Sequence, residues 1–242
     1  MTPFVRILVV ALAMLPCNLR AQHLTYAEWL VEARRDGRLN PAFKGHRLTS
    51  EQRASNNELV KQVLANGADR RTASDHLVDL GRQHLAEGDL RKAMYRFNHG
   101  WLVDSTNARA YHGFGLFFIA LDRTTEAGVQ FAQGLDRDSG NVDLLRDMAA
   151  TLLSQQAAIR SEKPDRADTM VRTALDLLLR AERQAPTDLA VLQRVTTCHL
   201  LLRQCNDART WLERFERSGG SGEPRAALRE LLRTTCTGPV VR

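Results

Sequence analysis

Histidine and cysteine side chains are the residues of this chain that a metal site or a catalytic centre would use. His76 and His84 stand eight residues apart, and on one helix that spacing separates them too far along the axis to share a metal ion. Cys198, His199 and Cys205 include no Cys-x-x-Cys pair and have no fourth ligand at zinc spacing. We therefore interpret His84 and His199 as packing residues, and the sequence predicts neither a metal nor a cofactor.

Other short motifs are also incomplete. The run Asp136–Asp143 resembles a calcium-binding loop, but its glycine comes one place early and the terminal glutamate is missing, so we expect a turn between helices. Gly113-Phe114-Gly115 lacks the third glycine of a nucleotide-binding loop. The chain has no Gly-x-Ser-x-Gly, His-Glu-x-x-His or P-loop pattern. The sequence predicts that the protein is not an enzyme, with a metal-dependent enzyme as a remote alternative.

The composition fits a folded chain of one or two domains. The 242 residues are 43% hydrophobic and 26% charged, and 15 glycines and 7 prolines are too few for a low-complexity chain. The 34 basic and 28 acidic residues give a net charge of +6. Because the basic residues are dispersed among the acidic ones, the sequence predicts no nucleic-acid partner.

The N-terminus has the layout of a secretory signal peptide. Arg6 precedes an apolar run, Ile7–Leu15, and Ala21 offers a small residue before a cleavage point. The nine-residue run is far shorter than the roughly 20 residues of a membrane-spanning helix. We expect residues 1–21 to be removed and the protein to be exported, periplasmic or secreted, without a transmembrane span. A lipid anchor on Cys17 is disfavoured, because Leu15-Pro16 stands where a small residue is expected.

Removal of residues 1–21 leaves three cysteines, Cys198, Cys205 and Cys236. In an oxidising compartment, one disulfide and one free thiol is the simplest outcome. The spacing does not choose among the three pairings.

A 34-residue period is the strongest signal in the chain. Residues 74–84 align with residues 108–118, and the alignment continues downstream. It places Gly81 on Gly115, Ala93 on Ala127 and Phe97 on Phe131. Each unit reads as a first helix, a short break such as Glu87-Gly88-Asp89, and a second helix. A mid-helix glycine costs about 1 kcal/mol against alanine, so we expect each glycine to admit the phenylalanine of its paired helix.

These residues resemble the tetratricopeptide repeat, a helix–turn–helix module of 34 residues. The resemblance implies an all-α fold in which helical hairpins stack into a right-handed superhelix, an α-solenoid. It also implies a set of packing positions: Gly81, Ala93, Phe97, Gly115, Ala127, Phe131, Ala149, Ala174 and Ala208.

The repeat register divides the chain into four parts. After the signal peptide, residues 22–72 form an N-terminal helical segment, either a cap or a degenerate repeat. Residues 73–218 hold about four repeats, interrupted at 155–167 by a longer loop or by extended helix ends. Residues 219–242 form a linker, a capping helix and a tail that we expect to be frayed from Thr234 to Arg242. Within the N-terminal segment, Thr49 and Gln52 predict a capping box.

The resemblance implies that the first helices of the repeats line a concave groove. Carried over to this chain, its groove positions include Arg82, Arg109, His112, Arg146 and Gln193. The three arginines predict a basic track for the carboxylates of a peptide, or else they belong to ordinary solvated faces. The leading hypothesis is an exported scaffold for protein–protein interaction, whose protein or peptide partner carries acidic groups. The alternative is a structural or assembly component of a cell-envelope complex, and the oligomeric state stays open.

Overall fold

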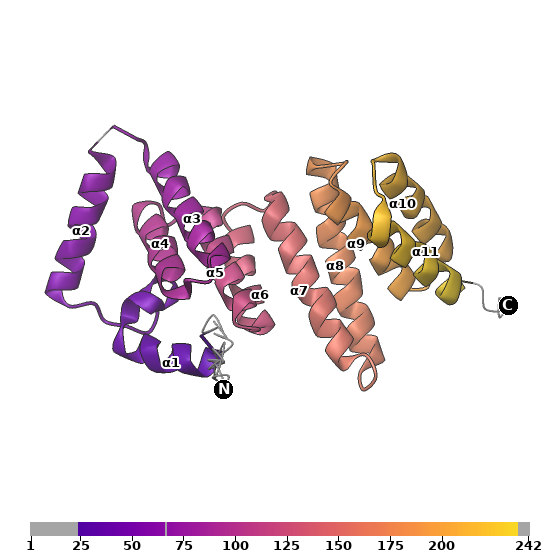
Figure 1. Ribbon diagram of the computed structural model, residues 1–242, viewed down its shortest axis with the longest axis horizontal. Coiled ribbons are helices and arrows are strands. Elements are labelled where there is room, and N and C mark those ends of the chain that lie inside the picture. Colours follow the sequence, from indigo (N-terminus) through magenta and orange to yellow (C-terminus); the bar gives the residue numbers. More distant parts are fainter. Residues whose placement is uncertain (1–23, 66, 237–242) are drawn as a thin grey trace, which may run out of the picture.

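The structure, a computed structural model, describes residues 24–65 and 67–236, so the expected signal peptide and Cys17 lie outside the described residues. Within those ranges the chain forms eleven α-helices, two short 3-10 helices and no strand. The helices follow one another along the molecule in chain order from α3 to α11 (Figure 1). The protein is therefore an α-solenoid, as the 34-residue period predicts.

Four antiparallel helical hairpins make up the array. They are α3 (Arg70–Ala86) with α4 (Leu90–Val103), α5 (Ala108–Ala120) with α6 (Thr124–Leu135), α7 (Val142–Ile159) with α8 (Pro164–Gln184), and α9 (Leu189–Leu201) with α10 (Cys205–Arg217). The first helix of each hairpin begins at an Asp or Asn whose side chain accepts a backbone N–H of the first turn: Asp69, Asn107, Asn141 and Asp188. These caps fix where each repeat begins.

The irregular third repeat is a hairpin of two long helices. α7 continues to Ile159 and α8 starts at Pro164, so only residues 160–163 turn the chain. Of the two alternatives for residues 155–167, the structure has extended helix ends rather than a loop. Arg160, in the turn, donates to Asp168 at 2.9 Å and holds the two ends together.

Small and large residues interlock inside the hairpins. A Cβ atom on Gly81 would lie 2.5 Å from the ring of Phe97, and one on Gly115 would lie 2.1 Å from the ring of Phe131. Both rings are fully buried, as are the five alanines of the packing set, Ala93, Ala127, Ala149, Ala174 and Ala208. The glycines are thus required by the close approach of the paired helices.

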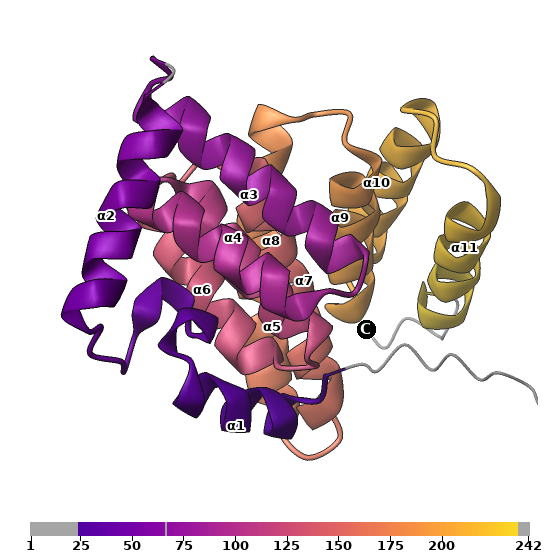
Figure 2. The ribbon, with the colours of Figure 1, turned by 60° about the vertical axis from the view of Figure 1, so that its left-hand side comes forward.

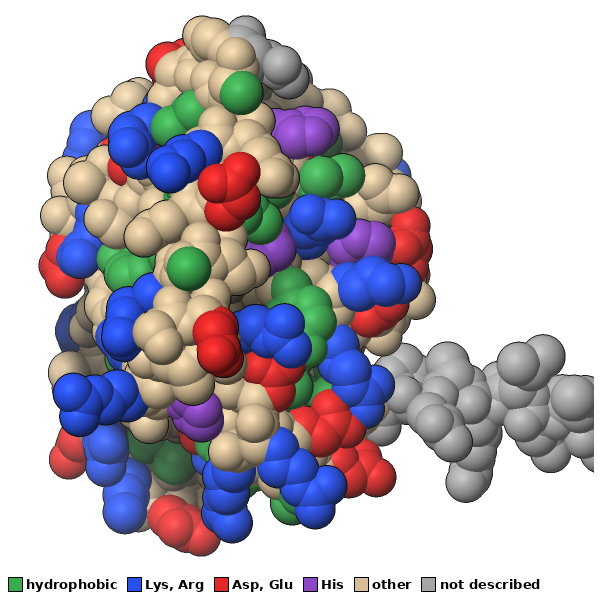
Figure 3. All heavy atoms as spheres, turned by 90° about the vertical axis from the view of Figure 1, so that its left-hand side faces the viewer, with side chains coloured by type: hydrophobic (Ala, Val, Ile, Leu, Met, Phe, Trp, Pro, Cys, Tyr) green, Lys and Arg blue, Asp and Glu red, His purple; other side chains and the backbone are tan. Residues whose placement is uncertain are grey.

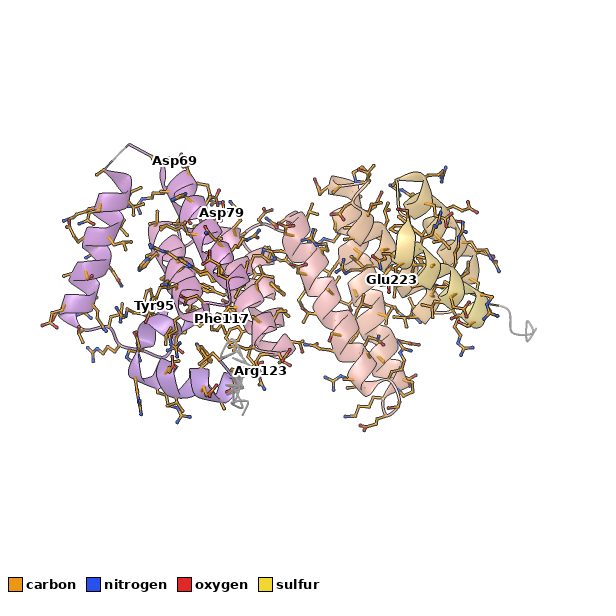
Figure 4. The ribbon with its side chains drawn as sticks, viewed as in Figure 1. Asp69, Asp79, Tyr95, Phe117, Arg123 and Glu223 are labelled. Carbon is orange, nitrogen blue, oxygen red and sulfur yellow. A yellow bond between two sulfur atoms is a disulfide. The ribbon has the colours of Figure 1, made fainter. Side chains whose placement is uncertain are left out.

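The N-terminal segment is not a helical hairpin. α1 (Tyr26–Arg35) lies across the end of the second hairpin, where the Trp29 ring meets the rings of Phe117 and Phe118 at 5.6 and 5.5 Å (Figure 2). The 3-10 turns Gly37–Leu39 and Pro41–Phe43 follow, and buried Asn98 of α4 donates to the carbonyls of Arg38 and Asn40. Figure 4 shows Tyr95 and Phe117 on the side of the array that faces this segment.

Helix α2 (Ser50–Leu64) stands apart from α1 and has no buried residue (Figure 1). Its last turns place Val60, Val63 and Leu64 against a small cluster from the first hairpin that includes Leu77. The predicted capping box of Thr49 and Gln52 is confirmed, with both reciprocal hydrogen bonds present.

The array ends in α11 (Gly222–Cys236), which packs on α9 and α10. Leu228 is buried and Leu232 is partly buried, whereas Ala227 and Leu231 are exposed, so the apolar face is narrower than the sequence suggests.

The expectation of a frayed tail from residue 234 is wrong as far as residue 236. The helix continues to Cys236 because a disulfide joins that residue to Cys205 at the start of α10. Cys198 is the buried free thiol, and burial raises its pKa to about 12.

Candidate binding face

The first helices of the four hairpins share one face, which we call the helix-A face (α3, α5, α7 and α9). One register position of this face carries opposite charges in successive repeats: Asp75, Arg109 and Asp143 are each 34 residues apart. Arg109 Nη1 lies 3.2 Å from Asp75 Oδ1, and the same guanidinium also pairs with Asp79. Figure 4 labels Asp79 on α3, on the side of the molecule away from α1.

His112 lies at the centre of the face and is 3% exposed, so a partner cannot reach it. Arg82 Nη2 lies 2.5 Å from His112 Nδ1, and His112 Nε2 lies 2.8 Å from Asp147 Oδ2. A guanidinium can only donate, so Nδ1 accepts and the proton of the neutral ring sits on Nε2, which donates to Asp147. His112 therefore relays a hydrogen-bond chain across three helices, from α3 through α5 to α7.

Arg146 extends this chain to the fourth repeat. Its guanidinium lies 2.8 Å from Asp143, 3.3 Å from Asp147 and 3.6 Å from Asp188, the residue that caps α9. Burial alone raises the pKa of Asp147, but the hydrogen bonds from His112 and Arg146 and the charge of Arg146 outweigh burial and lower it. The Asp147 carboxyl group is consequently ionised at neutral pH.

The charge balance of the helix-A face differs from the expected basic track. The ion pairs of this face form two groups. In one, Arg109 pairs with Asp75 and Asp79. In the other, Arg82 and Arg146, with His112 between Arg82 and Asp147, are joined to Asp143, Asp147 and Asp188. Each guanidinium is already paired with a carboxylate of its own chain, so the network offers no free arginine to an acidic partner. Gln193, on α9, is half-buried, and its side chain takes no part in the network.

A pocket of about 580 Å³ opens beside this network, between α5, α6 and α7. Its apolar walls are Leu116, Ile119, Phe131 and Ala150, and its polar lining is Asp122, Thr124, Asp147, Thr151 and Ser154. Leu116 and Ala150 occupy the register position held by Arg82 in the first repeat, so the face changes from charged to apolar along the array. The pocket volume lies within the usual range for ligand sites.

The groove positions expected from the sequence also include Asp75 and Asp143, but the sequence did not indicate that aspartates pair with all three arginines or that a pocket opens beside them. The 34-residue alternation of Asp75, Arg109 and Asp143 predicts ion pairs between neighbouring repeats. The replacement of Arg82 by Leu116 and Ala150 in the next two repeats predicts an apolar stretch. Both signals appear only when one register position is followed through successive repeats.

Of the residues considered for metal chemistry, His84 and His199 have structural roles, whereas His76 is exposed. His84 is half-buried and lies 3.2 Å from Glu87, while His199 is buried, stacks on Trp211 and lies 2.8 Å from Gln204 Oε1. The Asp136–Asp143 run is the turn before α7, in which Asp138 accepts the Gly140 N–H at 3.1 Å. The part of the chain that the structure describes has no cluster of three metal-ligating side chains.

The N-terminal end of the molecule adds no surface of one charge. On the N-terminal end of the molecule, Lys and Arg side chains are interspersed with Asp and Glu (Figure 3). Among residues 24–65 and 67–236, no helix has the length and apolar character needed to cross a membrane.

The fold is shared with solved repeat proteins. The PilF protein of Pseudomonas aeruginosa matches with a TM-score of 0.56 and 19% identity, over 69% of this chain and 75% of that protein. A tetratricopeptide-repeat protein of Thermus thermophilus, TTC0263, matches with a TM-score of 0.54 and 19% identity, over 66% and 82%. No family model matches the chain, and no curated relative matches it. The chain has the tetratricopeptide-repeat fold, and at this identity the similarity concerns the fold alone.

Proposed function

We propose that this protein is an exported scaffold that binds a segment of another protein along the helix-A face. The observation that carries the proposal is the pocket between α5, α6 and α7, which opens on a face whose side chains are already fixed by ion pairs. A pre-organised face loses little side-chain entropy when a partner binds. The similarity to solved proteins of this fold supports the proposal, because stacked helical repeats form extended concave surfaces that bind other proteins.

Two features support export. Residues 1–21 have the pattern of a secretory signal peptide. The Cys205–Cys236 disulfide suits an oxidising compartment, because cytosolic proteins keep such thiols reduced. Cell fractionation and N-terminal sequencing test this part, and we expect a soluble envelope or secreted protein that begins near Gln22. A cytosolic protein that retains Met1 would contradict it.

A displayed library of extended random peptides tests binding by the face. We expect the protein to select a peptide family, and we expect Ala150→Arg to abolish selection, because the new side chain fills the pocket. Val129→Arg is the matched control, since Val129 lies on α6, is 51% exposed and does not line the pocket. Selection that survives Ala150→Arg, or no selection at all, would rule out the pocket as the binding site.

A further inference from the structure

The charges at the pocket are of one sign. Asp122 and Asp147 are the formally charged residues among those that line it, and no lysine or arginine does so. Asp122 lies in the turn between α5 and α6, where its φ of 57° is a left-handed conformation that aspartate tolerates. Its side chain is exposed at the rim of the pocket. Within the described residues Asp122 forms no ion pair, whereas its neighbour Arg123 pairs with Glu126.

The nearest cation in the network cannot neutralise this pocket. Arg146 already faces three carboxylates, those of Asp143, Asp147 and Asp188. The ion-pair group beside the pocket holds three aspartates, Asp143, Asp147 and Asp188, against two arginines, Arg82 and Arg146, so it keeps one excess negative charge while His112 is neutral. An added carboxylate would be repelled here, and an added cation would be attracted.

The apolar walls require a second feature of the ligand. Leu116 and Ile119 present hydrocarbon to the hollow, and Ile119 is 39% exposed. Exposed apolar area beside a fixed charge is covered best by an apolar side chain that lies next to an opposite charge.

We infer that the pocket binds a segment of a partner protein in which a bulky apolar residue stands next to a lysine or arginine. The apolar side chain covers Leu116, Ile119 and Ala150, and the cation lies against the carboxylates of Asp122 and Asp147. This inference rests on the proposed function, and it reverses the charge expected for the partner from the sequence.

The peptide library also tests this inference. We expect the selected peptides to share an aliphatic or aromatic residue beside a basic one. For a synthetic peptide of that kind, Asp122→Asn should weaken binding about fivefold, as expected for loss of one exposed ion pair worth about 1 kcal/mol. At about 0.5 M salt most of that difference should disappear, because screening weakens the pair in the unmodified protein.

Two controls isolate the charge effect. Asp176→Asn removes an exposed carboxylate from α8, outside the pocket, and should leave the affinity unchanged. A peptide with glutamate in place of its basic residue should bind more weakly than one with glutamine.

The possible outcomes separate the inference from the proposed function. Acidic or uncharged peptides that depend on the pocket and ignore Asp122→Asn would overturn the inference and leave the scaffold function intact. An absence of pocket-dependent peptides would overturn both. Self-association that Ala150→Arg abolishes would identify a second copy as the occupant and would also overturn the inference.

Discussion

The Nε2 atom of His112 lies 2.8 Å from Oδ2 of Asp147, although the two residues are 35 positions apart and belong to different repeats. Arg82 holds the other ring nitrogen, so the contact orients three helices relative to one another. Its position beside the pocket links the stability of the stack to the shape of the binding face.

We expect Asp147→Ala to destabilise the protein by about 1–3 kcal/mol. The substitution leaves the buried Nε2–H of His112 without its acceptor and removes a partner of Arg146. Urea denaturation measures the effect. Asp176→Ala, at an exposed site on α8, should change stability by less than about 0.5 kcal/mol. Equal effects from the two variants would refute a structural role for the His112–Asp147 contact.

The interlock inside the hairpins predicts opposite effects for two glycines. Gly115→Ala should cost about 1–3 kcal/mol, because the new Cβ would lie 2.1 Å from the buried Phe131 ring. Gly128→Ala, also within a helix, has no atom nearer than 3.8 Å and should gain up to about 1 kcal/mol from helix propensity. Thermal melts of both variants check this, and a stable Gly115→Ala protein would mean that the hairpin packing is incorrect.

Acid should weaken the attachment of the N-terminal segment. The hydrogen bond from Arg38 lowers the pKa of Asp36 to about 2, and Tyr95 of α4 donates to the same carboxylate at 2.8 Å. Because the folded pKa lies below the unfolded one, this contribution is present above about pH 4 and is lost as the pH falls towards the folded value.

Asp36→Asn should therefore cost about 1 kcal/mol at neutral pH and less in acid. Urea denaturation of both proteins over a pH series measures the difference. A gap that stays constant down to about pH 2 would show that ionised Asp36 contributes nothing.

The disulfide should hold α11 in place. Cys205 and Cys236 are separated by 31 residues, and the chain-entropy model assigns about 3–4 kcal/mol to a loop of that length. Cys236→Ser should thus speed hydrogen exchange in α11 and lower the melting temperature. Cys198→Ser is the control, because it replaces a cysteine with serine and leaves the disulfide intact. Unchanged exchange in α11 would mean that packing of Leu228 suffices to hold the helix.

The repeat fold could be predicted from the sequence because its signal is periodic. Gly81 with Phe97 and Gly115 with Phe131 recur at a fixed interval, and each pair lies within one hairpin. The N-terminal segment could not be predicted in the same way, because Trp29 meets Phe117 across 88 residues without any repeated pattern.

The candidate site was harder to predict for a different reason. The sequence places Arg82, Arg109 and Arg146 on one face, but whether a guanidinium is free depends on side chains contributed by neighbouring repeats. Asp143 and Asp147 come from the repeat after Arg109, and Asp188 from the one after Arg146. The net charge of the helix-A face therefore cannot be predicted from its basic residues alone, because acidic residues of neighbouring repeats pair with them.

The N-terminal segment also affects the order in which the repeats unfold. In a solenoid each repeat contacts its neighbours alone, so unfolding normally begins at an end and proceeds one repeat at a time. Here the segment bonds to α4 through Asn98 and lies on α5 through Trp29, while Tyr26 donates to Glu126 of α6 at 3.3 Å. The first two repeats are thereby tied into one cooperative unit that cannot fray separately. The third and fourth repeats, α7 to α10, lie outside this unit, and their loss would leave the α3–α6 unit folded.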